Sequence, residues 1–586
     1  MKSALFAARS YIGSMCGIVG YTGYRNAVDV VFKGLKALEY RGYDSAGIAT
    51  ECGKISVYKS AGRVQMLKSK LPASPCHTAI GHTRWATHGK PLTKNAHPHL
   101  SFDGKIAVVH NGIIENYKEL KADLTAKGIT FASDTDSEVV AHLLALEKGD
   151  FLQAVAKVAG TLKGAATFLA IRENDDNIYC SKRGTSLAIG VGDGESFVAS
   201  DTLAICEYLN AAIPLEDGDM AVVSKSGVNI LNSGAVVKRQ AYCVARTMPS
   251  ESECFMRSEI DEIPQAATRT VDEFFCTDHR DVEEKIRCAT KLCFVGCGTA
   301  YHAALYGKQV FSHLLHKTCE AVESSEFDDT QIDNETVAVF ISQSGETADT
   351  VLAARKCVQK GGTSVAICNV HASLITFVAD ATYYTNAGAE VAVAATKSYV
   401  CQLLVLYMLA KRCAGENPDA SCIANLAKAL ESATKQTLFT PTCLDKNLFF
   451  IGKGQDIVTA KEAALKVKEI TCKMTDSYPA GELKHGPIAL IDDKSLAVVV
   501  ATNEQDKARI EATTSELRSR GATVFAVSGI GDLGADKTVY LPPISDELLS
   551  PIVAVVPLQN LALELSLAHG LNPDKPRNLA KSVTVI

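Results

Sequence analysis

The most informative stretch of the chain is Met15-Cys16-Gly17-Ile18-Val19-Gly20-Tyr21, in which a cysteine precedes a short run of strand-forming residues. The run 18–21 predicts a buried β-strand that starts next to Cys16. A cysteine that is the first residue of a chain can use its own α-amine, with a pKa of about 7.7–8.0, as the base that activates the thiol. Cys16 is internal and has no such amine. We therefore expect residues 1–15 to be absent or removed when Cys16 acts in this way.

The leader, residues 1–15, contains Lys2 and Arg9 and no acidic residue. Its apolar stretch, residues 4–8, is shorter than the h-region of about 7–15 residues that a secretory signal needs. Two interpretations remain open: either Met15 is the true initiator, or the leader is a weak organellar presequence.

Composition excludes several classes of protein. A chain of 586 residues is long enough for roughly three or four domains. The net charge of -6 and the absence of a clustered basic stripe argue against a nucleic-acid platform. No uninterrupted apolar run approaches the roughly 18–20 residues of a membrane span. The 19 cysteines are scattered and form no CxxC pair, which indicates a reduced, cytoplasmic protein.

The first part of the chain, residues 16–240, predicts an α+β sandwich. Strand-like runs at 18–21, 106–110, 167–171 and 220–223 alternate with glycine-containing and polar turns. The clearest helical pattern in this part is 136–145. Since few helices separate the strands, we expect sheets packed on each other. Linker-like sequence follows from 224 to 264, with a helical start near 255–260, and we place the linker at 241–270.

From Lys291 onward the sequence predicts regular strand–loop–helix units, the pattern of a doubly wound parallel sheet. The pattern occurs twice, first with strands at 292–296, 337–341 and 364–368, then at 448–451, 496–501 and 523–527. We therefore expect two α/β domains, 271–425 and 426–575, followed by a tail at 576–586. The first copy has Ser342-Gln343-Ser344-Gly345 after its second strand, whereas the second has Ala501-Thr502-Asn503-Glu504. Only the first copy is expected to bind a ligand at this loop.

Three polar segments in the first part suggest acyl transfer from an amino-acid amide. They are Gly81-His82-Thr83-Arg84-Trp85-Ala86-Thr87-His88-Gly89, His110-Asn111-Gly112-Ile113-Ile114-Glu115-Asn116 and Ser133-Asp134-Thr135-Asp136-Ser137-Glu138. Such chemistry needs a thiol, donors for an oxyanion and a binding site for the substrate's charged ends. Taken alone, each segment has a plainer interpretation: a core thiol, a turn or a helix cap. The histidines show no convincing metal-ligand spacing, so no metal is expected.

In their residues and in their order along the chain, the Cys16 stretch and these three segments resemble the N-terminal-nucleophile (Ntn) glutaminases. The stretch Leu-Glu-Tyr-Arg-Gly-Tyr-Asp-Ser-Ala-Gly at 38–47 narrows the resemblance to the glutamine:fructose-6-phosphate amidotransferase family. The resemblance implies that Cys16 is the nucleophile and that Asn111 and Gly112 supply the oxyanion donors. It also implies that glutamine is bound by Arg84, Trp85, Thr87, His88 and Asp136.

The same resemblance identifies the second half as two sugar-isomerase (SIS) domains. The loop at 342–347 lies where a helix begins, a position that favours anions, and the resemblance makes it the phosphate-binding loop. The sugar phosphate is then bound by Cys297, Gly298, Thr299, Ser342, Gln343, Ser344, Thr347, Val393 and Ala580. The chain departs from the family at Ala300 and Ala395, where serine is usual, which puts one sugar hydroxyl contact in doubt.

Lys461-Glu462-Ala463-Ala464-Leu465-Lys466-Val467-Lys468-Glu469 puts Glu462, Lys466 and Glu469 on one face of a helix. From the pattern alone, a solvated ion-pair face is the plainer interpretation. The resemblance instead makes Glu469 the proton-shuttling base, with Lys466 beside it and Glu462 in support. It also makes His485 the ring-opening histidine and Lys581 the lysine that forms a Schiff base.

The resemblance as a whole implies a two-site enzyme that takes L-glutamine and fructose 6-phosphate. Ammonia would pass from one site to the other through a dry interior gated by Trp85, with no metal or organic cofactor. A homodimer is expected, with His485 donated across its interface. Two alternatives remain: another enzyme that shares only the glutaminase, such as a phosphoribosyl amidotransferase, and a sugar-phosphate-binding regulatory protein without activity.

Overall fold

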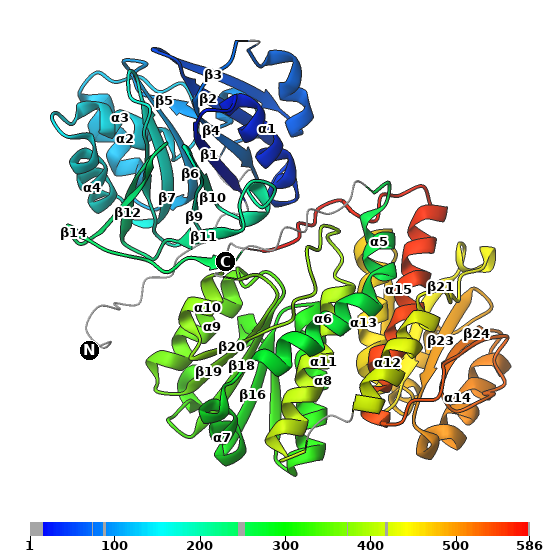
Figure 1. The fold of residues 1–586 in the computed structure, drawn as a ribbon. Helices are drawn as coiled ribbons and strands as arrows, with labels where there is room; N and C mark the ends of the chain where they lie inside the picture. The colour runs from blue at the N-terminus through cyan, green and yellow to red at the C-terminus, as the bar shows by residue number, and fades with distance from the viewer. Residues whose placement is uncertain are drawn as a thin grey trace. The chain divides into compact units, whose positions relative to one another are not determined.

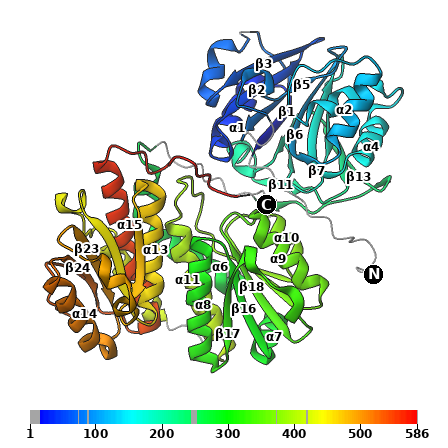
Figure 2. The ribbon, with the colours of Figure 1, turned by 180° about the vertical axis from the view of Figure 1, so that it is seen from behind.

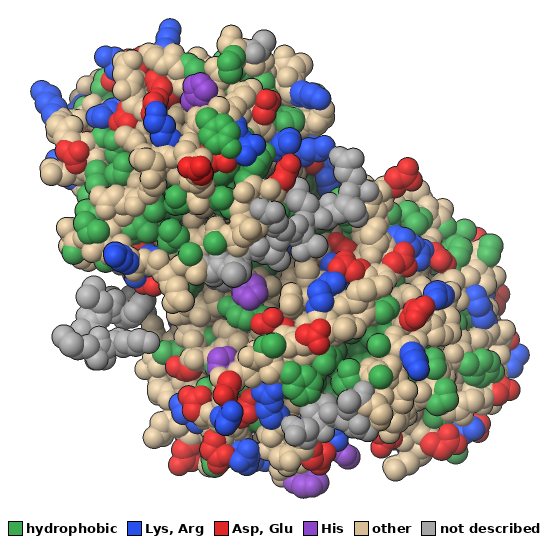
Figure 3. Space-filling model, viewed as in Figure 1, with side chains coloured by type: hydrophobic (Ala, Val, Ile, Leu, Met, Phe, Trp, Pro, Cys, Tyr) green, Lys and Arg blue, Asp and Glu red, His purple; other side chains and the backbone are tan. Residues whose placement is uncertain are grey.

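The computed structural model describes residues 16–72, 74–85, 89–243, 252–371, 373–416 and 420–583. The chain divides into two compact units (Figure 1). The first contains the described residues up to 243 together with 582 and 583, and the second contains those from 252 to 581. On the face drawn in Figure 3, acidic and basic side chains are interspersed over each unit.

The first unit contains two antiparallel sheets. Its strands are β1 Gly17–Gly23, β2 Ser45–Glu51, β3 Ile55–Ala61, β4 Thr78–Arg84, β5 His99–Leu100, β6 Ile106–Ile114, β7 Gly164–Arg172, β8 Ile178–Ser181, β9 Ala188–Val191, β10 Glu195–Ala199, β11 Ala211–Pro214, β12 Asp219–Ser224, β13 Gly227–Asn232, β14 Ala235–Val236 and β15 Tyr242–Cys243. One sheet has the order β15-β11-β9-β10-β1-β4-β2-β3, and the other has the order β14-β13-β12-β8-β7-β6-β5. Its helices are α1 Ala27–Ala37, α2 Tyr117–Ala126, α3 Glu138–Leu146 and α4 Phe151–Thr161.

These elements form four layers, with helix α1 on one outer face and helices α2–α4 on the other (Figures 1 and 2). The innermost core lies between the sheets, where Ile18, Ile80 and Val198 of one sheet meet Val109 and Leu169 of the other. Each outer layer has its own apolar cluster beneath its helices. Strands buried on both faces are favoured by removal of apolar area from water. The predicted α+β sandwich is confirmed.

The second unit contains two five-stranded parallel sheets. Their strands are β16 Lys291–Gly296, β17 Cys319–Glu323, β18 Thr336–Ser342, β19 Thr363–Cys368 and β20 Ala381–Tyr384, then β21 Asn447–Gly452, β22 Thr475–Pro479, β23 Ser495–Ala501, β24 Thr523–Ser528 and β25 Lys537–Tyr540. The orders β17-β16-β18-β19-β20 and β22-β21-β23-β24-β25 are the same arrangement used twice. The predicted pair of doubly wound domains is confirmed, and the predicted central strands match β16, β18, β19, β21, β23 and β24.

The helices of this unit are α5 Phe255–Asp261, α6 Ile263–Cys276, α7 Arg280–Cys288, α8 Thr299–Leu315, α9 Ala348–Gln359, α10 Leu374–Val378, α11 Lys397–Cys413, α12 Ala420–Ala433, α13 Asp456–Thr471, α14 Lys507–Ser519 and α15 Ser550–Ala568. Helices α8, α11, α13 and α15 pack together between the sheets and form one continuous core (Figure 1). Helices α9 and α14 cover the outer faces of the first and second sheet. The two domains therefore share a core, which brings residues of α8 against α13.

Within the described residues, one helical stretch, Glu547–Ala568, is long and apolar enough to cross a membrane by length and composition. We did not expect it, because Pro551, Pro557, Gln559 and Asn560 interrupt its apolar run. Of its most apolar window, 89% is buried inside the protein. The stretch is the central helix of the second unit's core.

The expected linker at 241–270 differs from the structure. Residues 227–232 form strand β13 of the first unit, so the linker-like sequence from 224 is partly sheet. Helices α5 and α6 belong to the second unit, where α5 packs on α15 and α6 packs on α11 and α12. Asp574 caps the start of the short helix α5. Its carboxylate accepts the backbone N–H groups of Phe255 and Met256 at 2.8 and 2.7 Å. Its polar sequence resembles a linker, but tertiary contacts order it.

The loops after the second strand of each copy make different contacts, and ligand binding by the first loop alone stays a prediction. In the second copy, the N–H and hydroxyl of Thr502 donate to the carboxylate of Asp456 at 2.8 and 2.7 Å. Asp456 is the first residue of α13 and is buried. Burial raises the pKa of this carboxyl to about 6, against the lowering effect of the bonds from Thr502. Donors of this loop therefore already bind an internal carboxylate.

Candidate active site

Cys16 lies at the start of β1 with its thiol against the end of β4. Its side chain is 6% exposed, and its Sγ accepts the backbone N–H of Trp85 at 3.3 Å. The next residues are fixed by side chains, since the N–H of Gly17 donates to Thr83 Oγ1 and that of Ile18 donates to Ser200 Oγ. The nucleophile predicted from the sequence is thus held at the junction of two paired strands.

Asn111 contacts Cys16 directly. Its Nδ2 donates to the carbonyl oxygen of Cys16 at 3.0 Å, and its Oδ1 lies 3.1 Å from Nε2 of His82. Both Asn111 and His82 are buried. The sequence analysis assigned Cys16 and Asn111 to one reaction, and strands β1 and β6 bring the two residues together.

The backbone conformation at position 112 requires glycine, independently of the oxyanion role predicted for Gly112. It has a φ of +126°, and a Cβ at this position would lie 2.1 Å from the carbonyl oxygen of Ala165 on the paired strand β7. Only glycine fits a residue with both constraints. Strand β6 can therefore present backbone groups beside Asn111 without a side chain in the way.

Arg84, at the end of β4, and Asp136, before α3, are both buried. Arg84 donates to the carbonyl oxygen of Gly89 at 3.1 Å, and burial lowers the pKa of its guanidinium, while the nearby charges of Cys16, Asp136 and Asp44 oppose that shift. Asp136 accepts the backbone N–H of Ile114 at 2.8 Å. The predicted helix at 136–145 begins two residues later, at Glu138. Asp136 thus bonds to β6 instead of lying inside α3.

Trp85 is half-buried, and its ring packs edge-on against Tyr43 with centroids 5.4 Å apart. Thr87 and His88, also predicted to contact glutamine, lie outside the described residues. Their roles stay predictions.

In the second unit, the predicted phosphate loop lies between β18 and the 12-residue helix α9. The hydroxyl of Ser342 accepts the N–H of Gly345 at 3.0 Å and lies 3.2 Å from Thr347 Oγ1, while Ser344 Oγ accepts the N–H of Glu346. Backbone N–H groups and hydroxyls thus gather where the helix begins, an arrangement that favours an anion. The carbonyl oxygen of Gln343 accepts the N–H of Asn369.

Glu462 and Lys466 are fully buried and Glu469 is partly exposed, so the three form a largely buried network instead of a solvated face. Lys466 Nζ lies 3.3 Å from Glu462, 2.6 Å from Glu469 and 2.8 Å from Thr299 Oγ1. Burial lowers the pKa of Lys466, but the charges of the two glutamates outweigh it and hold that pKa above its ordinary value. Thr299, of the predicted sugar loop, belongs to the same network because it donates to Glu462 at 3.0 Å.

His302 is a further member of this network. Its Nδ1 lies 2.7 Å from Glu462 Oε2, and it is one helical turn from Thr299 on α8. The sequence analysis missed it, although the spacing of three residues between Thr299 and His302 puts both on one face of a helix.

Lys581 makes an ion pair with Glu390 at 2.5 Å, and both side chains are almost fully buried. Glu390 also accepts the N–H groups of Thr396 and Ser398 and the hydroxyl of Ser398. Burial raises the pKa of Glu390, but Lys581 and these donors outweigh it and lower that pKa to about 2. Glu390 is therefore a carboxylate beside the predicted Schiff-base lysine, and the sequence analysis did not find it.

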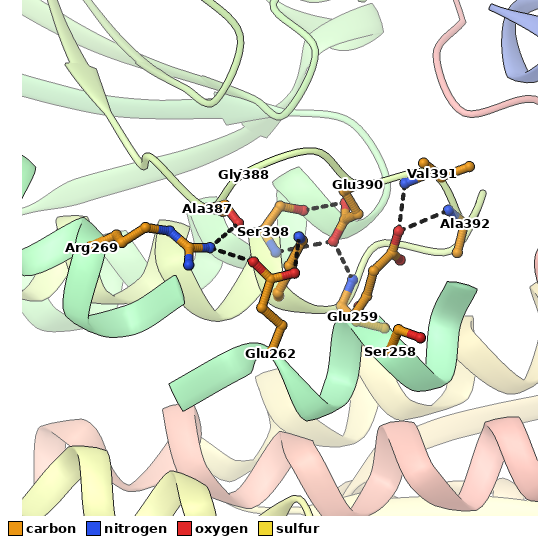
Figure 4. A network of polar contacts seen from close by, with 12 residues as sticks. Ser258, Glu259, Glu262, Arg269, Ala387, Gly388, Glu390, Val391, Ala392 and Ser398 are labelled. Atoms are coloured by element: carbon orange, nitrogen blue, oxygen red, sulfur yellow. Dashed lines mark hydrogen bonds and ion pairs between the residues drawn. The ribbon is translucent and has the colours of Figure 1, made fainter. Parts of the chain in front are cut away.

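Glu259 is the second carboxyl of this region. It points from α5 to the backbone N–H groups of Val391 and Ala392 (Figure 4), which it accepts at 2.5 and 3.1 Å. Burial, followed by the charge of Glu390, raises the pKa of Glu259 to about 8. Two carboxyls next to one lysine thus have opposite protonation states at neutral pH.

The remaining predicted residues are less closely connected. Val393 donates its N–H to the carbonyl oxygen of Asp574 at 3.1 Å, Cys297 Sγ lies 3.8 Å from Thr350 Oγ1, and Ala580 is half-buried. Gly298 has a positive φ of 55° that suits glycine. His485 is exposed at the end of a short helix, Glu482–His485. Among the described residues, no hydrogen bond or ion pair joins His485 to the other candidates.

Comparison with known proteins covers both units. A glutamine amidotransferase domain matches residues 82–207, and the SIS domain matches 285–412 and 445–567. An isomerizing glutamine–fructose-6-phosphate aminotransferase of Thermococcus kodakarensis is 43% identical, over 97% of this chain and 100% of its own length. The chain belongs to the isomerizing glutamine–fructose-6-phosphate aminotransferase family. A member of this family from Aquifex aeolicus is 40% identical over the same shares of both chains.

A solved structure shows the same family in the second unit. The C-terminal domain of glucosamine-fructose-6-phosphate aminotransferase from Francisella tularensis superposes with a TM-score of 0.52 at 28% identity, covering 56% of this chain and all of that domain. The sequence resemblance to the aminotransferase family is therefore confirmed over 97% of the chain.

Within this aminotransferase family fold, the residues that sequence reasoning missed are buried polar partners of the predicted ones. Besides Glu390, Glu259 and His302, they include Arg41, which lies in the motif at 38–47. Arg41 donates to the carbonyl oxygen of Ser200 at 2.9 Å and pairs with Asp201 at 3.6 Å. Arg41 of this motif therefore holds Ser200, whose Oγ accepts the N–H of Ile18 on β1, two residues after Cys16.

Proposed function

We propose that the chain catalyses the glutamine-dependent conversion of fructose 6-phosphate into glucosamine 6-phosphate, with release of glutamate. The observation that carries this proposal is the similarity to the aminotransferase of T. kodakarensis, because it extends over 97% of the chain and includes both units. The contacts of Cys16 with Asn111 and of Lys581 with Glu390 support it, because they hold the two predicted reactive side chains among buried polar groups.

In the first site, the Cys16 thiol loses its proton to the α-amine and its sulfur adds to the carboxamide carbon of glutamine. The oxygen that becomes negative accepts hydrogen bonds from the Asn111 NH2 group and the Gly112 N–H. The α-ammonium returns its proton to the amide nitrogen, which leaves as ammonia, and water then hydrolyses the thioester to glutamate and the free thiol. Arg84 suits the substrate carboxylate through its two parallel N–H groups, and Asp136 suits its ammonium. The contact of Cys16 with Asn111 at 3.0 Å supports these roles.

In the second site, the loop 342–347 binds the phosphate, and the Lys581 amine condenses with the C2 carbonyl of the open sugar to form a Schiff base and water. The unprotonated lysine is the nucleophile, and Glu390, 2.5 Å from Nζ, holds this side chain in place. Ammonia then replaces the lysine nitrogen at C2, and Glu469 moves a proton between C1 and C2. Lys466, which contacts Glu469 at 2.6 Å, holds that carboxylate. We assign ring opening to His485, because histidine exchanges protons near neutral pH.

We also propose that the chain is a cytoplasmic homodimer. The exposed position of His485 supports the idea that this side chain completes the site of a second copy. Ammonia must remain neutral to react, so we propose that it passes between the sites through a dry interior of the protein, with Trp85 as the gate.

The test is an assay of purified protein with glutamine and fructose 6-phosphate, measuring glucosamine 6-phosphate and glutamate. We expect both products in equal amounts. Tight binding of fructose 6-phosphate without amino sugar would overturn the proposal and favour a sugar-phosphate-binding regulatory protein. Glutamate formed only with phosphoribosyl pyrophosphate would favour the other amidotransferase class.

A further inference from the structure

His82 is a buried histidine that the proposed mechanism does not use. It lies on β4, paired with Ile18 of β1 and Gly47 of β2, and its side chain has no exposed surface. Its Nε2 lies 3.0 Å from the carbonyl oxygen of His110 and 3.1 Å from Oδ1 of Asn111. The ring is stacked on His97 with centroids 4.1 Å apart. His97 in turn accepts the N–H of His110 at 3.2 Å, so both rings are held against β6.

The hydrogen-bond partners determine where the protons lie. The carbonyl oxygen of Cys16 can only accept, so the Asn111 atom that faces it at 3.0 Å is the NH2 group. The other atom of the same carboxamide, Oδ1, then faces His82. Nε2 of His82 has two oxygen acceptors within reach and must carry the proton. Within the described part of the chain, Nδ1 has no acceptor that would favour the other tautomer.

The imidazole stays neutral across the working range of an enzyme. Burial, opposed by the bond to Asn111, lowers the pKa of His82 to about 3. The ring therefore presents one N–H on one side at every pH near neutrality. It is a fixed donor and not a proton carrier.

We propose that His82 is a positioning residue for the oxyanion donor, because its Nε2–H fixes the Asn111 carboxamide with the NH2 group toward Cys16. This inference rests on the proposed function of Asn111. The two ends of a carboxamide are nearly equal in size, so packing alone does not prevent it from turning over. A turned amide would present its oxygen to the Cys16 carbonyl and to the developing oxyanion. The donor from His82 disfavours that state.

Three substitutions test whether the Nε2–H donor of His82 matters or only the shape of its side chain. In His82→Gln, the amide nitrogen stands as many bonds from Cβ as Nε2 does. In His82→Asn, the nitrogen stands where Nδ1 does, one bond short. His82→Phe keeps a flat ring and removes the donor.

The experiment measures glutamate release from glutamine by the full-length enzyme. Because loss of an oxyanion donor costs about 10²- to 10³-fold in kcat, we expect His82→Phe and His82→Asn to lose about 10- to 100-fold in kcat with less than about a threefold change in KM. His82→Gln is expected to recover most of the activity. Equal defects in His82→Gln and His82→Asn, at equal melting temperatures, would overturn the proposal.

A double-mutant cycle with Asn111→Ala distinguishes the positioning role of His82 from the oxyanion role of Asn111. If His82 acts through Asn111, adding His82→Phe to Asn111→Ala costs little more, less than about threefold. If the losses of kcat caused by His82→Phe and by Asn111→Ala multiply fully, the positioning role of His82 is wrong, but the oxyanion role of Asn111 still stands. An Asn111→Ala enzyme with native kcat would instead overturn the proposed oxyanion role, and the inference about His82 with it.

Discussion

At the scale of single residues, the chemistry of Cys16 depends on a free α-amine. We predict that the active polypeptide begins at Cys16, by removal of Met15 or of a longer leader. Intact mass and N-terminal sequencing of the native protein test this. Protein that retains the leader is expected to lose glutamine hydrolysis by more than about 10³-fold, because a peptide nitrogen cannot act as the base. Full glutaminase activity with the leader attached would contradict the prediction.

Glu259 makes stability depend on pH in a direction opposite to most carboxyls. Its pKa is about 8 in the folded protein against an ordinary 4.5. Between these values the folded chain holds a proton that the unfolded chain has released, so the free energy of unfolding falls as the pH rises through this window. Glu259→Gln keeps the acceptor for Val391 and Ala392 and removes the titration.

We therefore predict that Glu259→Gln is more stable than the native protein at about pH 8, by up to a few kcal/mol, and that the difference shrinks toward about pH 5. Melting temperatures of both proteins across this range are the measurement. Parallel curves would show that Glu259 does not titrate there. The neighbouring Glu390, whose pKa is lowered to about 2, contributes stability that is lost only as the pH falls below about 4.5, outside this range.

The residue pairs that the sequence could not predict share one physical reason. Lys581 and Glu390 are 191 residues apart, and Glu259 is 132 residues from Val391. Local sequence patterns cannot predict contacts between residues that lie so far apart in the chain. Glu462, Lys466 and Glu469 could be placed on one helix face, but their burial follows from packing of α8 on α13, which no periodicity encodes. The Ala300 and Ala395 departures have no explanation in the described contacts.

At the scale of elements, Gly345 is the turn that shapes the phosphate loop. It has a φ of +66°, and a Cβ there would lie 1.9 Å from Ser373 Oγ. We predict that Gly345→Ala raises KM for fructose 6-phosphate by about tenfold or more, since the loop must shift to relieve this contact. Steady-state assays of amino-sugar formation measure it, and glutamine hydrolysis without sugar reports on the first unit.

Gly361, just beyond the C-terminus of α9, is the matched control. It also has a positive φ, +89°, but nothing lies within 4 Å of its Cβ position. Gly361→Ala is expected to lower stability by about 1 kcal/mol without changing KM. A similar KM for both variants would show that the loop's geometry is not what binds the phosphate.

The elements themselves were predicted unevenly from the sequence. Central strands such as β18 and β23 are buried on both faces and form continuous apolar runs, which a reader of the sequence can find. The edge strands β17, β20, β22 and β25 are short and partly exposed. Their residues do not differ enough from loop sequence to be recognised, so pairing with a neighbour defines them.

At the scale of the whole molecule, the proposed dimer and the exposed His485 lead to a complementation test. His485→Ala and Lys581→Ala are each expected to abolish amino-sugar formation. If His485 serves the partner's site, a mixed dimer of the two variants contains one intact site. Random mixing then recovers about a quarter of the native activity. No recovery in mixed dimers of confirmed composition would place His485 in the site of its own chain.

Asp456 has a consequence for redesign of the chain. The two SIS copies share one strand order, but in the second copy the Asp456 carboxylate accepts donors of the loop after β23. Placing Ser-Gln-Ser in that loop alone would leave a buried carboxylate facing any incoming phosphate. A second phosphate site therefore needs Asp456 and the loop to be replaced together.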